Sequence, residues 1–311
     1  MLTIFESILP IFLLVVLGVL LKRWRAIDRD MWNGLEQLGF FVFFPSLLFT
    51  TLANAEFSGL AAGSVAIGSI GSVTLIALLL SLSWPLFRAA GVSGASFTSV
   101  FQTSTRWNAF IALAIGEKLY GTESLALVAL VATLIIIPLN FYNIAVLIWF
   151  GGGSRSLKTF LWKVVTNPMI IGSVLGVVVN LLGIPIYRPL MQTAEMVASA
   201  SLSLGLIMVG AGLKLADALR PRPLALLPVV LKLIFMPLVM TIAAYALGMR
   251  GDQLLTIAMG ASVPTAMNGY VLAKQMGGDA PLYAAVATLQ TIASFFTIPM
   301  VLVAAAYLAG G

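Results

Sequence analysis

The chain has 311 residues, of which 60% are hydrophobic and 9% charged. Because a soluble globular domain carries roughly 25% charged residues, this composition excludes an ordinary soluble protein and indicates one solvated mostly by lipid. Cysteine and histidine are absent, so disulfides, thiolate metal sites and the usual general base near neutral pH are excluded. The net charge of +6 comes from basic residues in short loops between apolar segments, which indicates membrane topology. We therefore expect no cofactor, no metal and no nucleic-acid partner.

Five apolar segments occupy the first half, each close to the 20 residues that a helix needs to cross roughly 30 Å of hydrocarbon. The predicted spans are Leu2 to Leu21, Gln37 to Leu52, Ala61 to Phe87, Ala95 to Ile115 and Leu125 to Phe150. Lys22 and Arg23 follow the first segment, whereas a signal peptide carries its positive charges before the apolar region, so we predict a retained span. A turn at Glu117 to Gly121 separates the fourth span from the fifth.

A Gly-Ser segment from Gly151 to Ser156 is the clearest linker and lies at the middle of the chain. We predict a first repeat over residues 1–150, a linker over 151–163 and a second repeat over 164–311. The predicted spans of the second half are Pro168 to Leu182, Ala194 to Leu215, Ala225 to Leu247, Leu254 to Gln275 and Leu282 to Leu308. The sequence thus predicts an all-α membrane protein with ten transmembrane helices.

Two polar stretches interrupt the fourth and ninth predicted spans. They run from Gln102 to Phe110 and from Ser262 to Tyr270, and each ends in an asparagine, a small residue and an aromatic residue. They occupy corresponding places in the two halves. Interrupted apolar segments at matching positions are the best sequence pointer to a transporter's binding site, because non-helical backbone in a membrane must be buried in protein or line a wet cavity.

Weaker correspondences also relate the halves. Pro10 precedes Leu17-Gly18-Val19, and Pro168 precedes Leu175-Gly176-Val177, at the same spacing. Five spans per repeat is an odd number, so the second copy would lie inverted relative to the first. We therefore predict two inverted five-helix repeats.

The basic residues predict the orientation. Twelve fall in loops on the side reached after the first span, and only Lys118, Arg188 and Arg250 fall on the opposite side. Cytoplasmic loops carry the excess of Lys and Arg. We therefore predict that the linker is cytoplasmic and that both termini are extracytoplasmic. Arg106 and Lys232 remain inside spans.

These features resemble the auxin efflux carrier family, which includes plant auxin exporters and bacterial carriers of malonate and malate. The resemblance covers nearly the whole chain and is most specific at Val263-Pro264-Thr265-Ala266-Met267-Asn268-Gly269-Tyr270. It implies the inverted-repeat fold of bile-acid and sodium–proton transporters, with helices four and nine crossing at their breaks near the membrane midplane. It also implies a scaffold of helices 1, 2, 6 and 7 and an elevator-type movement of helices 3–5 and 8–10. The plant exporters carry a long central insertion that this chain lacks, so auxin is not carried over as the substrate.

The candidate substrate-binding residues lie in and beside the two breaks. They are Thr105, Arg106, Asn108, Asn140, Asn143, Pro264, Thr265 and Asn268. Half-helix N-termini attract anions, and the planar guanidinium of Arg106 matches a carboxylate. The alternative roles are structural: Pro264 as a simple kink, the asparagines as interhelical bonds, and Arg106 as the partner of Glu195. Lys232 fits a pathway and a structural pair equally well.

The predicted function is secondary transport of a small organic anion, such as a mono- or dicarboxylate, in a bacterial inner membrane. A channel would need a continuous polar stripe, and an enzyme would need a nucleophile with a base; neither pattern is present in the sequence. The sequence leaves open whether Na⁺ or H⁺ is coupled, with Glu195 as a candidate proton carrier, and whether the chain forms a homodimer. The alternatives are an ion-coupled transporter of another small solute and an anion channel.

Overall fold

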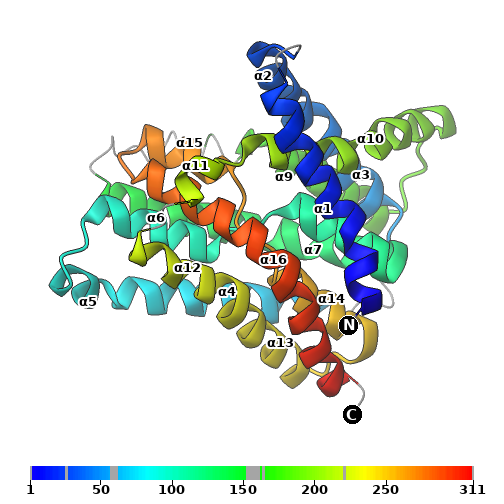
Figure 1. Cartoon of the computed structure of the whole chain (residues 1–311). Helices are drawn as coiled ribbons and strands as arrows, with labels where there is room; N and C mark the ends of the chain where they lie inside the picture. Colours follow the sequence, from blue (N-terminus) through cyan, green and yellow to red (C-terminus); the bar gives the residue numbers. More distant parts are fainter. Residues whose placement is uncertain are drawn as a thin grey trace.

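The computed structural model describes residues 2–24, 27–56, 62–151, 162, 165–219 and 222–309, and every regular element in these ranges is helical (Figure 1). The first half contains α1 (Leu2–Arg23), α2 (Arg29–Leu38), η1 (Gly39–Phe43), α3 (Phe44–Ala53), α4 (Ala62–Leu82), α5 (Trp84–Ala89), α6 (Gly94–Thr105) and α7 (Ala109–Phe150). The second half contains α9 (Pro168–Leu181), α10 (Arg188–Gly212), α11 (Leu215–Ala218), η3 (Pro223–Ala225), α12 (Leu226–Val230), η4 (Leu231–Phe235), α13 (Met236–Ala246), α14 (Gly251–Ala261), α15 (Asn268–Gln275) and α16 (Ala280–Ala309). The predicted linker lies almost wholly outside the described residues.

Seven helical stretches in the described residues are long and apolar enough to cross a membrane, so the chain is a multi-pass membrane protein. They are Leu2–Arg23, Asp30–Ala53, Gly63–Ala89, Gly94–Phe150, Arg188–Gly212, Pro223–Ala246 and Ala280–Ala309. Pro168–Leu181 is a shorter apolar helix, and α14 and α15 are shorter still, with 11 and 8 residues. The predicted turn at Glu117 to Gly121 is confined to Gly121, whose φ of 74° and ψ of −161° divide α7 into two helical parts.

Proline shapes two of these stretches. Pro45 is the second residue of α3, which follows the π-helical turn η1, and Pro237 is the second residue of α13, which follows the π-helical turn η4. A proline ring has no N–H and clashes with the carbonyl one turn earlier. The widened turn before each proline accommodates the ring, so both helices continue instead of ending.

Helices α1, α10, α3 and α9 pack closely in that order, each on the next, and form one group in Figure 1. Glycine makes these contacts possible, since a Cβ on Gly18 or Gly210 would strike the backbone of the facing helix in the α1–α10 pair. Gly172 and Gly176 have the same role where α9 meets α3. Small residues let membrane helices approach backbone to backbone, and van der Waals packing then holds them together.

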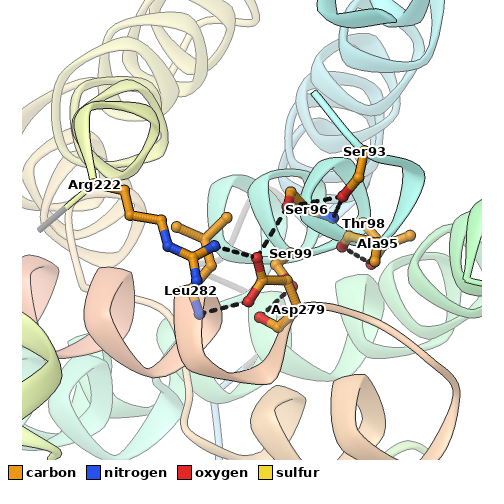
Figure 2. A network of polar contacts seen from close by, with 8 residues as sticks. All are labelled: Ser93, Ala95, Ser96, Thr98, Ser99, Arg222, Asp279 and Leu282. Atoms are coloured by element: carbon orange, nitrogen blue, oxygen red, sulfur yellow. Dashed lines mark hydrogen bonds and ion pairs between the residues drawn. The ribbon is translucent and has the colours of Figure 1, made fainter. Parts of the chain in front are cut away.

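Helices α4, α6 and α14 pack against α7, while α13 packs on α4 and α14 and α16 packs on α6 and α14. Helix α7 also contacts α1, α3, α9 and α10. A polar network fixes the start of α6 against the start of α16 (Figure 2). The carboxylate of Asp279 accepts from Arg222 at 2.7 Å, from the Ser96 hydroxyl at 2.9 Å and from the Leu282 N–H at 3.0 Å. The Ser99 hydroxyl donates to the Asp279 carbonyl at 2.8 Å. This network holds the start of α6, the end of that helix opposite to its break.

Candidate functional site

The first break consists of three residues, Arg106 to Asn108, between α6 and α7. The hydroxyls of Thr103, Ser104 and Thr105 donate to carbonyls one turn earlier, at 2.7, 2.8 and 3.0 Å, so these polar groups are satisfied inside the helix. Arg106 then adopts an extended backbone, with φ −71° and ψ 153°. Helix α7 restarts with Asn108 as its cap, whose side-chain oxygen accepts from the Ile111 N–H at 3.3 Å.

The second break runs from Ser262 to Met267, between α14 and α15. The Ser262 hydroxyl donates to the Met259 carbonyl at 2.7 Å. Pro264 has no N–H, which prevents a helix from continuing through it. Asn268 is the first residue of α15 and is exposed. The two asparagines therefore differ, because Asn108 is buried as a helix cap.

The two breaks touch through their main chains. The backbone N–H of Asn108 donates to the carbonyl oxygen of Pro264 at 2.8 Å. In an unbroken helix, both groups would bond to backbone groups of the same helix. Because the helices are interrupted here, each break instead supplies the hydrogen-bond partner that the other one lacks. The prediction that the breaks meet is consistent with this bond, and the distance between Asn108 and Asn268 stays a prediction.

Gln290 of α16 braces the second break against its neighbours. Its side-chain oxygen accepts from the Thr265 N–H at 2.9 Å, and its side-chain nitrogen donates to the carbonyls of Thr103 at 3.0 Å and Pro228 at 2.9 Å. The side chain is fully buried. Sequence reasoning missed this residue, although a lone glutamine in an apolar span was the available signal, because such a group must find hydrogen-bond partners.

Arg106 is buried, with 6% of its surface exposed. One guanidinium nitrogen, Nη1, donates to the Asn140 side-chain oxygen at 3.5 Å, a long contact. Its Nε and Nη2 have no hydrogen-bond partner among the described residues. The alternative partner, Glu195, is exposed and accepts instead from Asn54 at 3.3 Å. Arg106 therefore presents donors that the described protein leaves unused.

Further unused polar atoms lie beside Arg106. Both side-chain atoms of Gln102, one helical turn earlier and fully buried, lack a partner among the described residues, and so does the Trp107 indole nitrogen. Buried polar groups are nearly always hydrogen-bonded, and each exception calls for an explanation. Gln102 and Trp107 fall in the polar stretch that the sequence identified, and the structure adds them to the candidate site.

Thr105, Asn143 and Thr265 are held by the protein itself. Thr105 donates to the Asn143 side-chain oxygen at 3.2 Å, and the Asn143 amide donates to the Leu139 carbonyl at 2.6 Å. The Thr265 hydroxyl bonds the Tyr283 hydroxyl at 3.1 Å, and Tyr283 donates to the Ala266 carbonyl at 2.5 Å. These contacts position the breaks, and they leave these three side chains less available to a solute than Arg106.

Lys232 of η4 links both breaks. Its ammonium donates to the carbonyl of Ala261, the last residue of α14, at 2.8 Å, and lies 4.9 Å from the centre of the Trp107 ring. The side chain is fully buried. A positive charge at a helix C-terminus is stabilised by the helix dipole and by the free carbonyls there. Of the two roles considered for Lys232, this geometry fits the structural one.

The chain is similar in sequence to known membrane transport proteins. Residues 154–302 match the family model described as membrane transport protein. An uncharacterized transporter of Methanothermobacter thermautotrophicus is 27% identical over 301 residues, which cover 95% of this chain and 96% of that protein. The uncharacterized transporter YfdV of Escherichia coli K12 is 22% identical over 286 residues, covering 88% of this chain and 89% of YfdV, and the YfdV of Shigella flexneri matches equally.

Proposed function

We propose that the chain, which resembles the auxin efflux carrier family and matches a membrane-transport family model over residues 154–302, is a secondary carrier of a small organic anion. The anion class is that of mono- and dicarboxylates. The observation that carries the proposal is the guanidinium of Arg106, which is buried where two helices are interrupted and whose Nε and Nη2 have no partner in the described structure. A charge inside a span costs at least ~2.5 kcal/mol and marks a solute pathway or an ion pair by default.

Arg106 supplies the charge that recognises the anion. Its planar fork bonds a carboxylate through two parallel N–H donors, which fixes orientation as well as charge. Asn140 contacts it, and Gln102 lies one helical turn earlier in α6; both add uncharged donors and acceptors. Asn108 and Asn268 stand at the starts of α7 and α15, where half-helix dipoles favour negative charge. Thr105, Asn143, Pro264 and Thr265 shape the two breaks around this group.

We propose ten spans in two inverted repeats. Dividing α7 at Gly121, and counting α9 and the α14–α15 pair as spans, gives five segments before the linker and five after it. The group α1, α3, α9 and α10 is the scaffold in this scheme, and its glycine-mediated backbone contacts support a rigid role. The helices packed around α7 would then move as a unit and carry the site across the membrane, with the basic loops in the bacterial cytoplasm.

Binding and transport assays test the proposal. The purified protein is first screened by thermal shift against acetate, malonate, malate and other carboxylates, since a ligand that binds only the folded state raises the melting temperature. The best anion is then given as a radiolabelled substrate to proteoliposomes containing the protein. A carrier shows saturable uptake and counterflow, whereas an anion channel shows flux that rises linearly with concentration. If no carboxylate stabilises the protein or is taken up, the proposed substrate class is wrong.

The coupling ion is determined in the same vesicles. Imposed gradients of Na⁺ and of H⁺ are applied separately, and the gradient that drives uptake against the anion's own concentration difference identifies the coupled ion. Uptake of an uncharged solute under either gradient would instead favour the ion-coupled transport of another small solute.

A further inference from the structure

A cavity lies where the end of α1 meets the end of α10, and Lys214 in its wall reaches toward the helix that follows the second break. Its volume is about 450 Å³, enough for a small organic anion or a phosphate group. Its wall includes three basic residues, Lys22, Arg23 and Lys214, and small or apolar residues that include Val19, Gly210 and Ala211. No Asp or Glu is among the described residues that line it.

Two of the three cations of this cavity lie against aromatic rings. The Lys22 ammonium lies 5.3 Å from the Trp32 ring centre, and the Lys214 ammonium lies 3.6 Å from the Tyr270 ring centre. The ion pair found in the described residues joins Arg222 to Asp279 and involves none of the three cations. An aromatic ring orients a cation without neutralising its charge, so the positive charges of the cavity remain available to an anion.

Lys214 also connects the cavity to the second break. Its backbone N–H donates to the Thr288 hydroxyl of α16 at 3.1 Å, which fixes the chain where α10 ends. Tyr270, under its ammonium, is the third residue of α15, the helix that begins after the second break. In Figure 1, α11 and α15 lie at the same end of the molecule. An anion in this cavity therefore contacts a side chain packed on the interrupted helix.

We propose that this cavity is a binding site for a carboxylate or phosphate group, separate from the site at Arg106. Arg23 offers a bidentate fork, and Lys22 and Lys214 offer point charges on either side of it. Two sources carry this chemistry: a free anion and the headgroup of an anionic phospholipid, since basic pockets at the cytoplasmic ends of membrane helices bind such headgroups. The inference does not rest on the transported substrate.

The test uses the purified full-length protein and two probes. Inorganic phosphate is titrated in neutral detergent, with the melting temperature as readout. Phosphatidylglycerol is offered in nanodiscs with phosphatidylcholine, and retained lipid is counted by native mass spectrometry after gentle extraction. The cavity variants are Arg23→Gln and the double variant Lys22→Gln/Lys214→Gln. Arg88→Gln is the control, because Arg88 is an exposed basic residue on the predicted cytoplasmic side and does not line the cavity.

Phosphate that stabilises wild-type protein in detergent, with affinity about tenfold weaker in the cavity variants and unchanged in Arg88→Gln, supports the site with a free anion as its source. Phosphatidylglycerol retained by wild-type and Arg88→Gln protein but lost from the cavity variants supports it with a lipid headgroup as its source. Equal binding of both probes by wild-type and cavity variants overturns the proposal. Running both probes on Arg106→Ala separates the two sites, because binding at the cavity must survive that substitution even if the proposed transport function is wrong.

Discussion

The backbone N–H of Asn108 donates to the carbonyl oxygen of Pro264 at 2.8 Å, and this bond joins the two interrupted helices at their breaks. Asn108 precedes α7 and Pro264 lies between α14 and α15, so the contact links the two halves of the chain. Two further contacts fix the second break: Gln290 accepts from the Thr265 N–H, and Lys232 donates to the carbonyl at the end of α14. Arg106 stands next to this junction with donors unused, and the predictions below separate these roles.

Substituting Arg106 tests anion recognition. Removing a charged hydrogen bond typically loses about 1.5–3 kcal/mol, so Arg106→Ala should weaken anion binding by roughly tenfold or more. Arg106→Lys retains the charge but loses the bidentate fork, and we expect partial rescue. Affinity and melting temperature are measured on the same purified protein. A purely structural arginine would lower the melting temperature while leaving the affinity of the folded fraction unchanged, and that result removes Arg106 from the site.

Substituting Lys232 tests the link between the breaks. Lys232→Met removes the donor to the Ala261 carbonyl and the charge beside Trp107 while keeping an unbranched side chain of similar length. Leaving a buried carbonyl unpaired costs about 1–3 kcal/mol, so the melting temperature should fall by several degrees. Lys274→Met, at an exposed position in α15, is the matched control and should change little. Equal melting temperatures for the two variants would contradict the structural role of Lys232.

Substituting Gln290 tests the brace on the second break. Gln290→Leu deletes three hydrogen bonds and leaves the Thr265 N–H and two carbonyls buried without that partner. We expect a loss of about 2–4 kcal/mol, because each unsatisfied buried group costs about 1–3 kcal/mol and the site can relax in part. Gln290→Glu keeps the acceptor for Thr265 but not the donor, and should be intermediate. Gln275→Leu, on the exposed side of α15, serves as control. Unfolding in denaturing detergent gives the ranking, and a Gln290→Leu protein as stable as its control would refute the brace.

A cysteine pair tests whether the asparagines themselves are close. Because the chain has no cysteine, Asn108→Cys/Asn268→Cys is the only reactive pair in the protein. We expect a short bifunctional maleimide to join them, detected by mass spectrometry of the linking peptide. Asn108→Cys/Gln275→Cys, with the second cysteine at the far end of α15, is the matched control. Failure to link the first pair with reagents of every length, with and without the anion, would show that the crossing does not bring Asn108 to Asn268.

A single cysteine tests the orientation. We expect Ser154→Cys to react with a membrane-impermeant maleimide only after the cells are opened, because the basic residues predict a cytoplasmic linker. Labelling is followed by gel shift, with a cysteine at Thr122, next to Gly121, as the control expected to react from outside. Reaction of Ser154→Cys in intact cells would reverse the predicted topology.

Much of the arrangement follows from sequence because membrane helices obey few rules. Apolar length predicts the long spans, and polar residues flanked by apolar helix predict both breaks to within a few residues, as Arg106 to Asn108 and Ser262 to Met267 show. The matching glycines of the two halves, Gly18 and Gly176, also have a physical basis, since both lie where helices touch backbone to backbone.

The tertiary partners could not be predicted in this way. Periodicity does not show that Gln290 reaches across to Thr103 and Pro228, or that Lys232 contacts Ala261, because those contacts depend on how distant helices pack. The partner of Arg106 could not be predicted for the same reason. Its acceptor, Asn140, lies on the second part of α7, and Glu195 bonds Asn54 instead. The division of α7 at Gly121 depends on a single positive φ angle.

The bond between Asn108 and Pro264 uses only main-chain atoms, and this has an evolutionary consequence. Side chains at both positions can be exchanged without deleting either hydrogen-bonding group, apart from a proline at 108, which would remove the donor. Evolution can therefore replace the side chains around Arg106 and so change the bound solute, while the hydrogen bond between the two breaks is kept. Substrate diversity across related transporters would then require no redesign of the architecture that brings the two half-helices together.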